Sequence, residues 1–191
     1  MEMVSASKMK KAINAALGTR MYATLASELM ERLSALSEPN YSLFETRPVE
    51  NVLMILVSSN RGLCGSFNTN VSKMAKSLLE NTEKFAIHRT PDGETIQPKS
   101  TVTIDVLGIG KKSALFAKRH KLNLIGVFDE LKENPSVEDV LPISNLALKA
   151  FREKKYDKVA IVYTHFKSSL EQIVKVRQLL PILKIDLQKM I

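Results

Sequence analysis

Residues Val52–Val71 read Val-Leu-Met-Ile-Leu-Val-Ser-Ser-Asn-Arg-Gly-Leu-Cys-Gly-Ser-Phe-Asn-Thr-Asn-Val, and this stretch decides the fold class. Its first six residues are apolar without alternation, which is typical of a strand buried on both faces, as in a parallel sheet. The loop that follows carries Gly62 and Gly65, where the backbone can turn sharply at little steric cost. The next residues are candidate N-caps for an amphipathic helix: Asn68, Thr69 and Asn70. Together, strand, glycine turn and helix predict the start of a βα unit.

The composition indicates a folded domain whose net positive charge favours an acidic partner. The chain has 191 residues, 45% of them hydrophobic, which is enough to bury one medium-sized core. One cysteine excludes an internal disulfide, and the three histidines have no metal-ligand spacing. No apolar run reaches the roughly 20 residues needed to cross a bilayer, so we expect a cytosolic chain. The formal charge of +8 predicts attraction to nucleic acid, a membrane surface or an acidic protein segment.

Residues 1–37 predict one long helix. They contain no proline and one glycine, and they are rich in residues that lose little on entering a helix. A helix of about 36 residues is about 54 Å long, so part of it should project and pair with another helix. The alternative is a core helix of a bundle. The apolar positions recur every three or four residues, with a loss of phase near Gly18: Ala6, Met9, Ile13, Ala16, Tyr22, Leu25, Leu29, Leu33 and Leu36.

The rest of the chain alternates predicted strands with predicted helices, which favours an α/β fold. We expect a Rossmann-like, mostly parallel sheet flanked by helices over residues 45–180, after the projecting helix 1–37 and before a tail at 181–191. Residues 88–100 predict a polar excursion at the surface. Ser136 is the expected cap of a later helix, with Ser144 as the alternative because Pro142 intervenes. Predicted strands and helices occupy residues 71–81, 101–107, 111–120, 122–128, 159–163 and 170–176.

The glycine turn at Gly62–Gly65 is the candidate nucleotide site, since strand-to-helix turns present backbone N–H groups to anions. The motif does not match, because a Walker loop needs lysine after its second glycine and a dinucleotide loop needs a third glycine. Cys64 beside Arg61 is a candidate nucleophile, and a buried cysteine that packs the turn is the alternative. We therefore expect no catalytic residue, cofactor or metal ion in this chain.

Basic residues gather in two places. One run follows Gly110 and contains no acid, which suits either a solvated helix end or a docking patch for an acidic partner. The other lies near the start of the first helix. No aromatic residues are interleaved with these charges, so a nucleic-acid stacking surface is not expected. The run after Gly110 consists of Lys111, Lys112, Lys118, Arg119 and Lys121. The group near the start of the first helix consists of Lys8, Lys10, Lys11 and Arg20.

Several segments together resemble the γ subunit family of bacterial F-type ATP synthases. The most specific is Val57-Ser-Ser-Asn-Arg-Gly-Leu-Cys-Gly-Ser-Phe-Asn68, and Met1-Glu-Met-Val-Ser-Ala-Ser-Lys-Met-Lys-Lys11 is similar as well. Further likeness lies in Tyr22-Ala23, in Asp105–Lys112, in Val162–Phe166 and in Val176–Pro181. The resemblance extends over nearly the whole chain.

This resemblance implies a rotor without catalytic sites of its own. Family members pair an N-terminal and a C-terminal helix in a coiled coil inside the α3β3 ring, and their α/β domain sits against the ε subunit and the membrane c-ring. It implies a cytoplasmic location, peripheral on the inner face of the cell membrane, and no nucleic-acid or small-molecule partner. The resemblance implies that the first helix faces acidic segments of β through Met1, Met3, Lys8, Lys10 and Lys11. Further expected partner contacts are Arg61, Lys111 and Lys112.

Three departures from the family pattern carry further expectations. The family's first helix begins before the position of Met1, and its C-terminal helix has no counterpart after Pro181, which suggests a fragment. Asn60 stands where many family members have aspartate. A helix left without its partner should self-associate through its apolar stripe. A nucleotide-binding module or small enzyme that uses the Gly62–Gly65 turn remains the alternative function.

Overall fold

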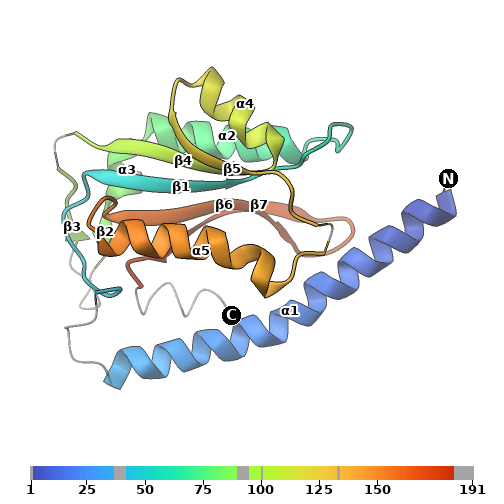
Figure 1. The fold of residues 1–191 in the computed structure, drawn as a ribbon, viewed down its shortest axis with the longest axis horizontal. Coiled ribbons are helices and arrows are strands. Elements are labelled where there is room, and N and C mark those ends of the chain that lie inside the picture. The colour runs from blue at the N-terminus through green and yellow to red at the C-terminus, as the bar shows by residue number, and fades with distance from the viewer. Residues whose placement is uncertain (1, 37–41, 90–94, 100, 133, 183–191) are drawn as a thin grey trace.

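The computed structural model describes residues 2–36, 42–89, 95–99, 101–132 and 134–182, and it has the predicted α/β architecture (Figure 1). Its elements, in chain order, are α1 (Glu2–Leu36), β1 (Asn51–Val57), α2 (Phe67–Glu80), α3 (Thr82–Ala86), β2 (His88–Arg89), β3 (Thr95–Ile96), β4 (Thr103–Ile109), α4 (Lys111–Arg119), β5 (Asn123–Phe128), α5 (Val137–Arg152), β6 (Lys158–Phe166) and β7 (Gln172–Leu180).

The main sheet has five strands in the order β5-β4-β1-β6-β7. β1 lies at its centre and pairs in parallel with β4 and β6, while β7 pairs antiparallel with β6 at one edge. The predicted mostly parallel sheet is therefore confirmed. Residues 170–176, predicted as a half-exposed edge strand, fall largely within β7.

Helices cover both faces of this sheet, as the apolar run of β1 requires. Val52, Met54 and Leu56 are buried on the face covered by α2 and α4, and Leu53 and Ile55 are buried on the face covered by α5 (Figure 1). All five side chains are at most 3% exposed. A strand without alternation is thus explained by burial on both sides.

α1 is one continuous helix that lies along the flank of the molecule and extends beyond the sheet at its N-terminal end (Figure 1). It passes Gly18 without a break, although the apolar stripe loses phase there. Arg20 donates a hydrogen bond to the backbone oxygen of Phe166 at the end of β6. Met21 and Tyr22 are 72% and 75% exposed, so the alternative of a bundle core helix is wrong.

Helix α5 begins where the sequence predicts. The Ser136 side chain accepts a hydrogen bond from the backbone N–H of Asp139, and the Asp139 carboxylate accepts one from the backbone N–H of Ser136 at 2.8 Å. This capping box holds the first turn, so the helix tolerates Pro142 inside it and the alternative cap at Ser144 is wrong.

Other local predictions were wrong in part. Thr95, Gln97 and Lys99 are exposed, as predicted for residues 88–100, but His88 is completely buried and the segment includes the short strands β2 and β3. β4 continues through Gly108 and Ile109, which were predicted to close it. The predicted tail beyond Ile182 lies outside the described residues.

The starts of β1 and β6 are joined by a partly buried ion pair. Arg47 Nε donates to Asp157 Oδ1 at 2.5 Å, and Asp157 Oδ2 accepts the backbone N–H groups of Glu50 and Asn51, both at 2.9 Å. Burial opposes ionisation of Asp157, but the hydrogen bonds from Arg47 and from these backbone groups outweigh it and lower the pKa of the carboxyl group. One carboxylate therefore fixes the position of two neighbouring strands.

Replacing Asp157 with alanine should lower the free energy of unfolding by about 3 kcal/mol, because Arg47 and two backbone donors lose their buried acceptor. Urea denaturation followed by circular dichroism measures the change. The matched control is Glu50→Gln, which removes an exposed ion pair with Lys99 and should change the free energy of unfolding far less, because solvent screens that pair. Equal losses in the two variants would contradict the assigned role of Asp157.

His88 should make the fold sensitive to acid. Burial and the charge of Lys158 lower the pKa of His88 from 6.5 to about 4, and neither ring nitrogen has a hydrogen-bond partner among the described residues. Between these values the unfolded chain binds a proton that the folded chain does not, so stability is full above pH 6.5 and falls as the pH drops towards 4.

The expected loss in the free energy of unfolding between pH 7 and pH 4.5 is about 2 kcal/mol larger in the parent chain than in the variant His88→Phe. Urea denaturation at pH 7 and at pH 4.5 measures the loss in each protein. Because each loss compares one protein with itself, it does not include the pH-independent effect of the substitution on stability. An identical pH dependence in the two proteins would show that His88 is not responsible.

Candidate functional site

The carboxyl ends of β1, β4 and β5 meet at one edge of the sheet, where α/β proteins commonly bind ligands. The backbone N–H of Ser58 donates to the carbonyl of Ile109 at 2.8 Å, and that of Gly110 donates to the carbonyl of Phe128 at 2.9 Å. These two bonds tie the three strand ends together. Any candidate nucleotide site of this chain has to lie at this edge.

The N-terminal N–H groups of α4, which could otherwise bind a phosphate, have partners within the chain. The N–H of Lys111 donates to Asn60 Oδ1 at 3.0 Å, that of Lys112 to the carbonyl of Ser59 at 3.2 Å, and that of Ser113 to Ser58 Oγ at 2.8 Å. The chain's own polar groups thus occupy the place of an anion. This arrangement disfavours nucleotide binding at α4.

Asn60 links the start of α4 to the end of β5 at this edge, a role that the sequence does not reveal. Besides accepting from α4, its side chain donates through Nδ2 to the carbonyl of Asp129 after β5 at 2.6 Å. Lys111 Nζ lies 3.6 Å from the carboxylate of Asp129. The sequence rule that strand ends meet at one edge could have selected Ser58 and Asp129 as neighbours of Asn60, because each residue directly follows or closely follows a strand.

The loop before α2 is held by Asn68, which is not a helix cap. α2 begins at Phe67, and its N-cap Ser66 makes no side-chain capping bond, so the predicted caps were wrong. Asn68 Oδ1 accepts the backbone N–H of Ser59 at 3.0 Å, and Asn68 Nδ2 lies 2.9 Å from Cys64 Sγ. The amide therefore bridges both sides of the loop.

Cys64 and its neighbours form an exposed loop tip. Cys64 is exposed, so the alternative of a buried cysteine packing the turn was wrong, and Leu63 beside it is fully exposed. Among the described residues, no three His, Cys, Asp or Glu side chains lie close enough together to hold a metal ion. The loop offers Cys64 hydrogen bonds from an amide but no histidine base.

The glycines at this edge have two different roles, a turn before α2 and a close contact before α4. A Cβ atom at Gly62 or Gly65 would meet no atom within 4 Å, so these residues do not serve close packing of helix and sheet. Gly65 has a φ of 56°, which accounts for its place in the turn. Close packing occurs instead at Gly110, where φ is 85° and a Cβ atom would lie 2.2 Å from the carbonyl oxygen of Ser58.

The residues predicted to contact partners lie in two regions, α1 and the carboxyl edge of the sheet. Lys8, Lys10 and Lys11 are exposed on the first turns of α1, whereas Arg61, Lys111 and Lys112 follow β1 and β4 at the carboxyl edge. Met3 belongs to α1, and Met1 lies outside the described residues. The N-terminal end of α1 and the loop after β1 point towards the same end of the molecule (Figure 1).

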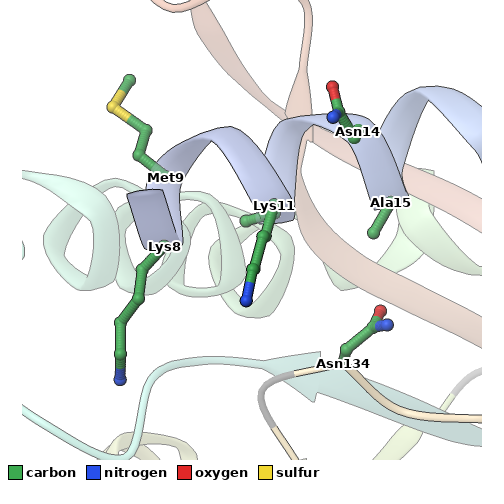
Figure 2. A pocket seen from close by; sticks show the side chains of 7 residues that line it. Lys8, Met9, Lys11, Asn14, Ala15 and Asn134 are labelled. Atoms are coloured by element: carbon green, nitrogen blue, oxygen red, sulfur yellow. The ribbon is translucent and has the colours of Figure 1, made fainter. Parts of the chain in front are cut away.

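A groove of about 780 Å³ separates the first turns of α1 from the loop before α5. Figure 2 shows the side chains of Lys8, Lys11 and Ala15 directed towards the side of Asn134, while Met9 and Asn14 project elsewhere. Two lysines therefore line the gap between helix and body. The lining residues are Lys8, Met9, Lys11, Ala12, Asn14, Ala15 and Asn134.

The two glycines provide a matched stability test. Gly110→Ala should lower the free energy of unfolding by more than about 2 kcal/mol, because alanine is strained at this positive φ and its Cβ meets the backbone of Ser58. Gly62→Ala should cost less than about 1 kcal/mol, since open space surrounds it. Thermal denaturation of both variants measures the contrast, and a greater loss at Gly62 would contradict it.

Comparison with known proteins agrees with this geometry. The family model described as ATP synthase matches residues 1–190. The chain is 34% identical to an ATP synthase gamma chain of Christiangramia forsetii, over 97% of this chain and 60% of that protein, and 36% identical to one of Roseiflexus sp., over 95% and 59%. The chain thus spans about 60% of the length of these curated relatives.

Among solved structures, the fold is similar to a chain in the central stalk and c-ring of the Tetrahymena thermophila mitochondrial ATP synthase. The TM-score is 0.60 at 23% sequence identity, over 100% of this chain and 75% of that chain. This likeness concerns the fold. The match over residues 1–190 and the similarity to the γ chains show that this chain belongs to the ATP synthase γ chain family.

Proposed function

We propose that this chain is the non-catalytic central-stalk subunit of an F-type ATP synthase, which couples proton flow through the membrane c-ring to ATP synthesis in the α3β3 ring by rotation. The observation that carries the proposal is α1, a 35-residue helix with large apolar side chains exposed along its length. A helix of about 52 Å with such a surface needs partners outside its own domain. Membership of the γ chain family supports the same role.

In this role residues 1–37 form the shaft helix and residues 45–180 form the foot, which rests on the ε subunit and the c-ring. An asymmetric shaft contacts the surrounding β subunits differently at each angle, so its rotation shifts their populations of conformations. Torque passes between shaft and foot through contacts such as the hydrogen bond from Arg20 to Phe166. The chain itself stays in the cytoplasm, attached to the inner face of the cell membrane through its partners.

The exposed lysines of α1 are the proposed contacts for the α and β subunits. Lys8, Lys10 and Lys11 present three positive charges within one helical turn, which suits an acidic segment of β. At the carboxyl edge, Arg61 is exposed on the loop tip and Lys111 lies near Asp129. Because three lysines lie close together on α1, we propose α1 as the main charged contact and assign Arg61, Lys111 and Lys112 a smaller part.

The alternative of a nucleotide-binding module or small enzyme is not favoured. The first N–H groups of α4 are bonded to Asn60, Ser59 and Ser58, and the turn at Gly62–Gly65 carries an exposed Cys64 without a histidine base. Titration of the chain with ATP and with NAD in a calorimeter separates the two functions. Heat from saturable binding of either compound would revive the alternative.

Binding to α and β subunits should depend on the charges of α1. The triple variant Lys8→Glu, Lys10→Glu, Lys11→Glu should bind the α and β subunits of the C. forsetii enzyme at least about tenfold more weakly than the parent chain, because attraction to acidic side chains becomes repulsion. Biolayer interferometry at low and at high salt measures the affinities. The difference should shrink at high salt.

The matched control reverses the charge of three lysines on helices α2 and α4 by replacing Lys73, Lys76 and Lys118 with glutamate. It should bind like the parent chain. Failure of the parent chain to bind α and β at micromolar concentrations would refute the proposed function. Equal weakening in both triple variants would refute only the assignment of α1 as the charged contact.

A further inference from the structure

The parallel strands of the sheet begin at the end opposite to the carboxyl edge, and we call the segments that lead into them the amino edge. The loop after β1 and the N-terminal end of α1 point away from this end (Figure 1). The two ends are therefore free to contact different partners. The described residues of the amino edge, which precede β1, β4, β5 and β6, are 42–50, 81–87, 95–99, 101–102, 118–122 and 152–157.

The surface of the amino edge has an excess of positive charge. It carries twice as many exposed cations as exposed acids, and its acids are Glu45, Glu50, Glu83 and Glu153. All of these acids except Glu83 already pair with a lysine. The cations of this edge that form no ion pair with a described residue are Lys84, Lys118, Arg119, Lys121, Arg152 and Lys155.

These six cations lie at or just after the C-terminal ends of α3, α4 and α5. The helix dipole favours a cation at each helix end, and the crossover topology then brings the three ends to the same side of the sheet. The starts of β5 and β6 are three strand spacings apart, or about 14 Å. The positive surface is therefore broad, and it belongs to no single loop.

The amino edge lacks the apolar anchors of a stable protein interface. Among the described residues, none of the large hydrophobic side chains that are exposed belongs to it. The carboxyl edge differs, because Leu63 and Leu170 are fully exposed there and its lysines form pairs such as Lys167 with Glu171. Protein interfaces depend on buried apolar and aromatic anchors, and single-stranded nucleic acid needs aromatic side chains for stacking. An anionic membrane surface needs only clustered cations.

We propose that the amino edge binds the anionic headgroups of a membrane surface through these six lysine and arginine side chains. Anionic lipids diffuse within the bilayer, so they gather opposite cations that come from several elements without a partner surface of fixed shape. Binding to lipid requires no other subunit. Its place in the cell rests on the proposed function, because with α1 directed into the α3β3 ring the amino edge is the end of the foot that faces the membrane.

Flotation of the full chain with lipid vesicles tests the proposal. Vesicles of phosphatidylcholine with about 30% phosphatidylglycerol should bind the chain, and vesicles of phosphatidylcholine alone should not. Two triple variants remove different parts of the surface, and each should bind at least about tenfold more weakly while its circular dichroism matches that of the parent chain. They are Lys118→Glu, Arg119→Glu, Lys121→Glu and Lys84→Glu, Arg152→Glu, Lys155→Glu.

The matched control is the variant Lys8→Glu, Lys10→Glu, Lys11→Glu, which changes the net charge equally at the other end of the molecule. It should bind vesicles like the parent chain, because salt screens charges that lie beyond about 8 Å from the bilayer. Its affinity for α and β should fall, whereas the amino-edge variants should keep that affinity. Failure to bind lipid and failure to bind α and β are therefore measured separately.

A parent chain that does not float with the anionic vesicles overturns the proposal. Equal weakening in the α1 variant and in both amino-edge variants also overturns it, since net charge alone would then explain the binding. Binding to phosphatidylcholine alone would show that headgroup charge is not recognised. Tighter binding of a DNA oligonucleotide, lost in the same amino-edge variants, would assign this surface to nucleic acid instead.

Discussion

Burial of β1 on both of its faces is the constraint on which the rest of the structure depends. Because Val52–Leu56 are almost fully inaccessible to solvent, helices must cover both sides of the sheet, and the chain must cross over between parallel strands. The crossovers bring three strand ends to one edge. The Arg47–Asp157 pair then fixes the opposite ends of β1 and β6, so both ends of the central strand are anchored.

The carboxyl edge has the geometry of a nucleotide-binding fold, but its polar groups are used internally. Asn60 connects the start of α4 to the residue after β5, and Asn68 connects the two sides of the loop before α2. The Asn60 amide accepts from an N–H group at the start of α4 that could otherwise bind an anion. Hydrogen bonds within the chain therefore hold the strand ends together at this edge.

Long apolar patterns were predictable from the sequence, and side-chain networks were not. The apolar run of β1, the long proline-free α1 and the Ser136 cap of α5 depend on local sequence, so their positions were predicted correctly. The burial of His88, the exposure of Cys64 and the role of Asn68 depend on contacts between distant segments. Gly110 was predicted to end a strand, yet its close approach to Ser58 depends on the register of β1 and β4.

Among the described helices, α1 carries the most large apolar residues that are accessible to a partner, such as Leu25 at 58% exposed. Hydrogen exchange of the full chain, with and without α and β subunits, measures directly whether α1 is the partner-binding element. We predict that the amides of α1 exchange several times more slowly in the complex, while those of β1 are unchanged. Unchanged exchange in α1, with protection confined to the loop at Gly62–Gly65, would contradict the proposed function.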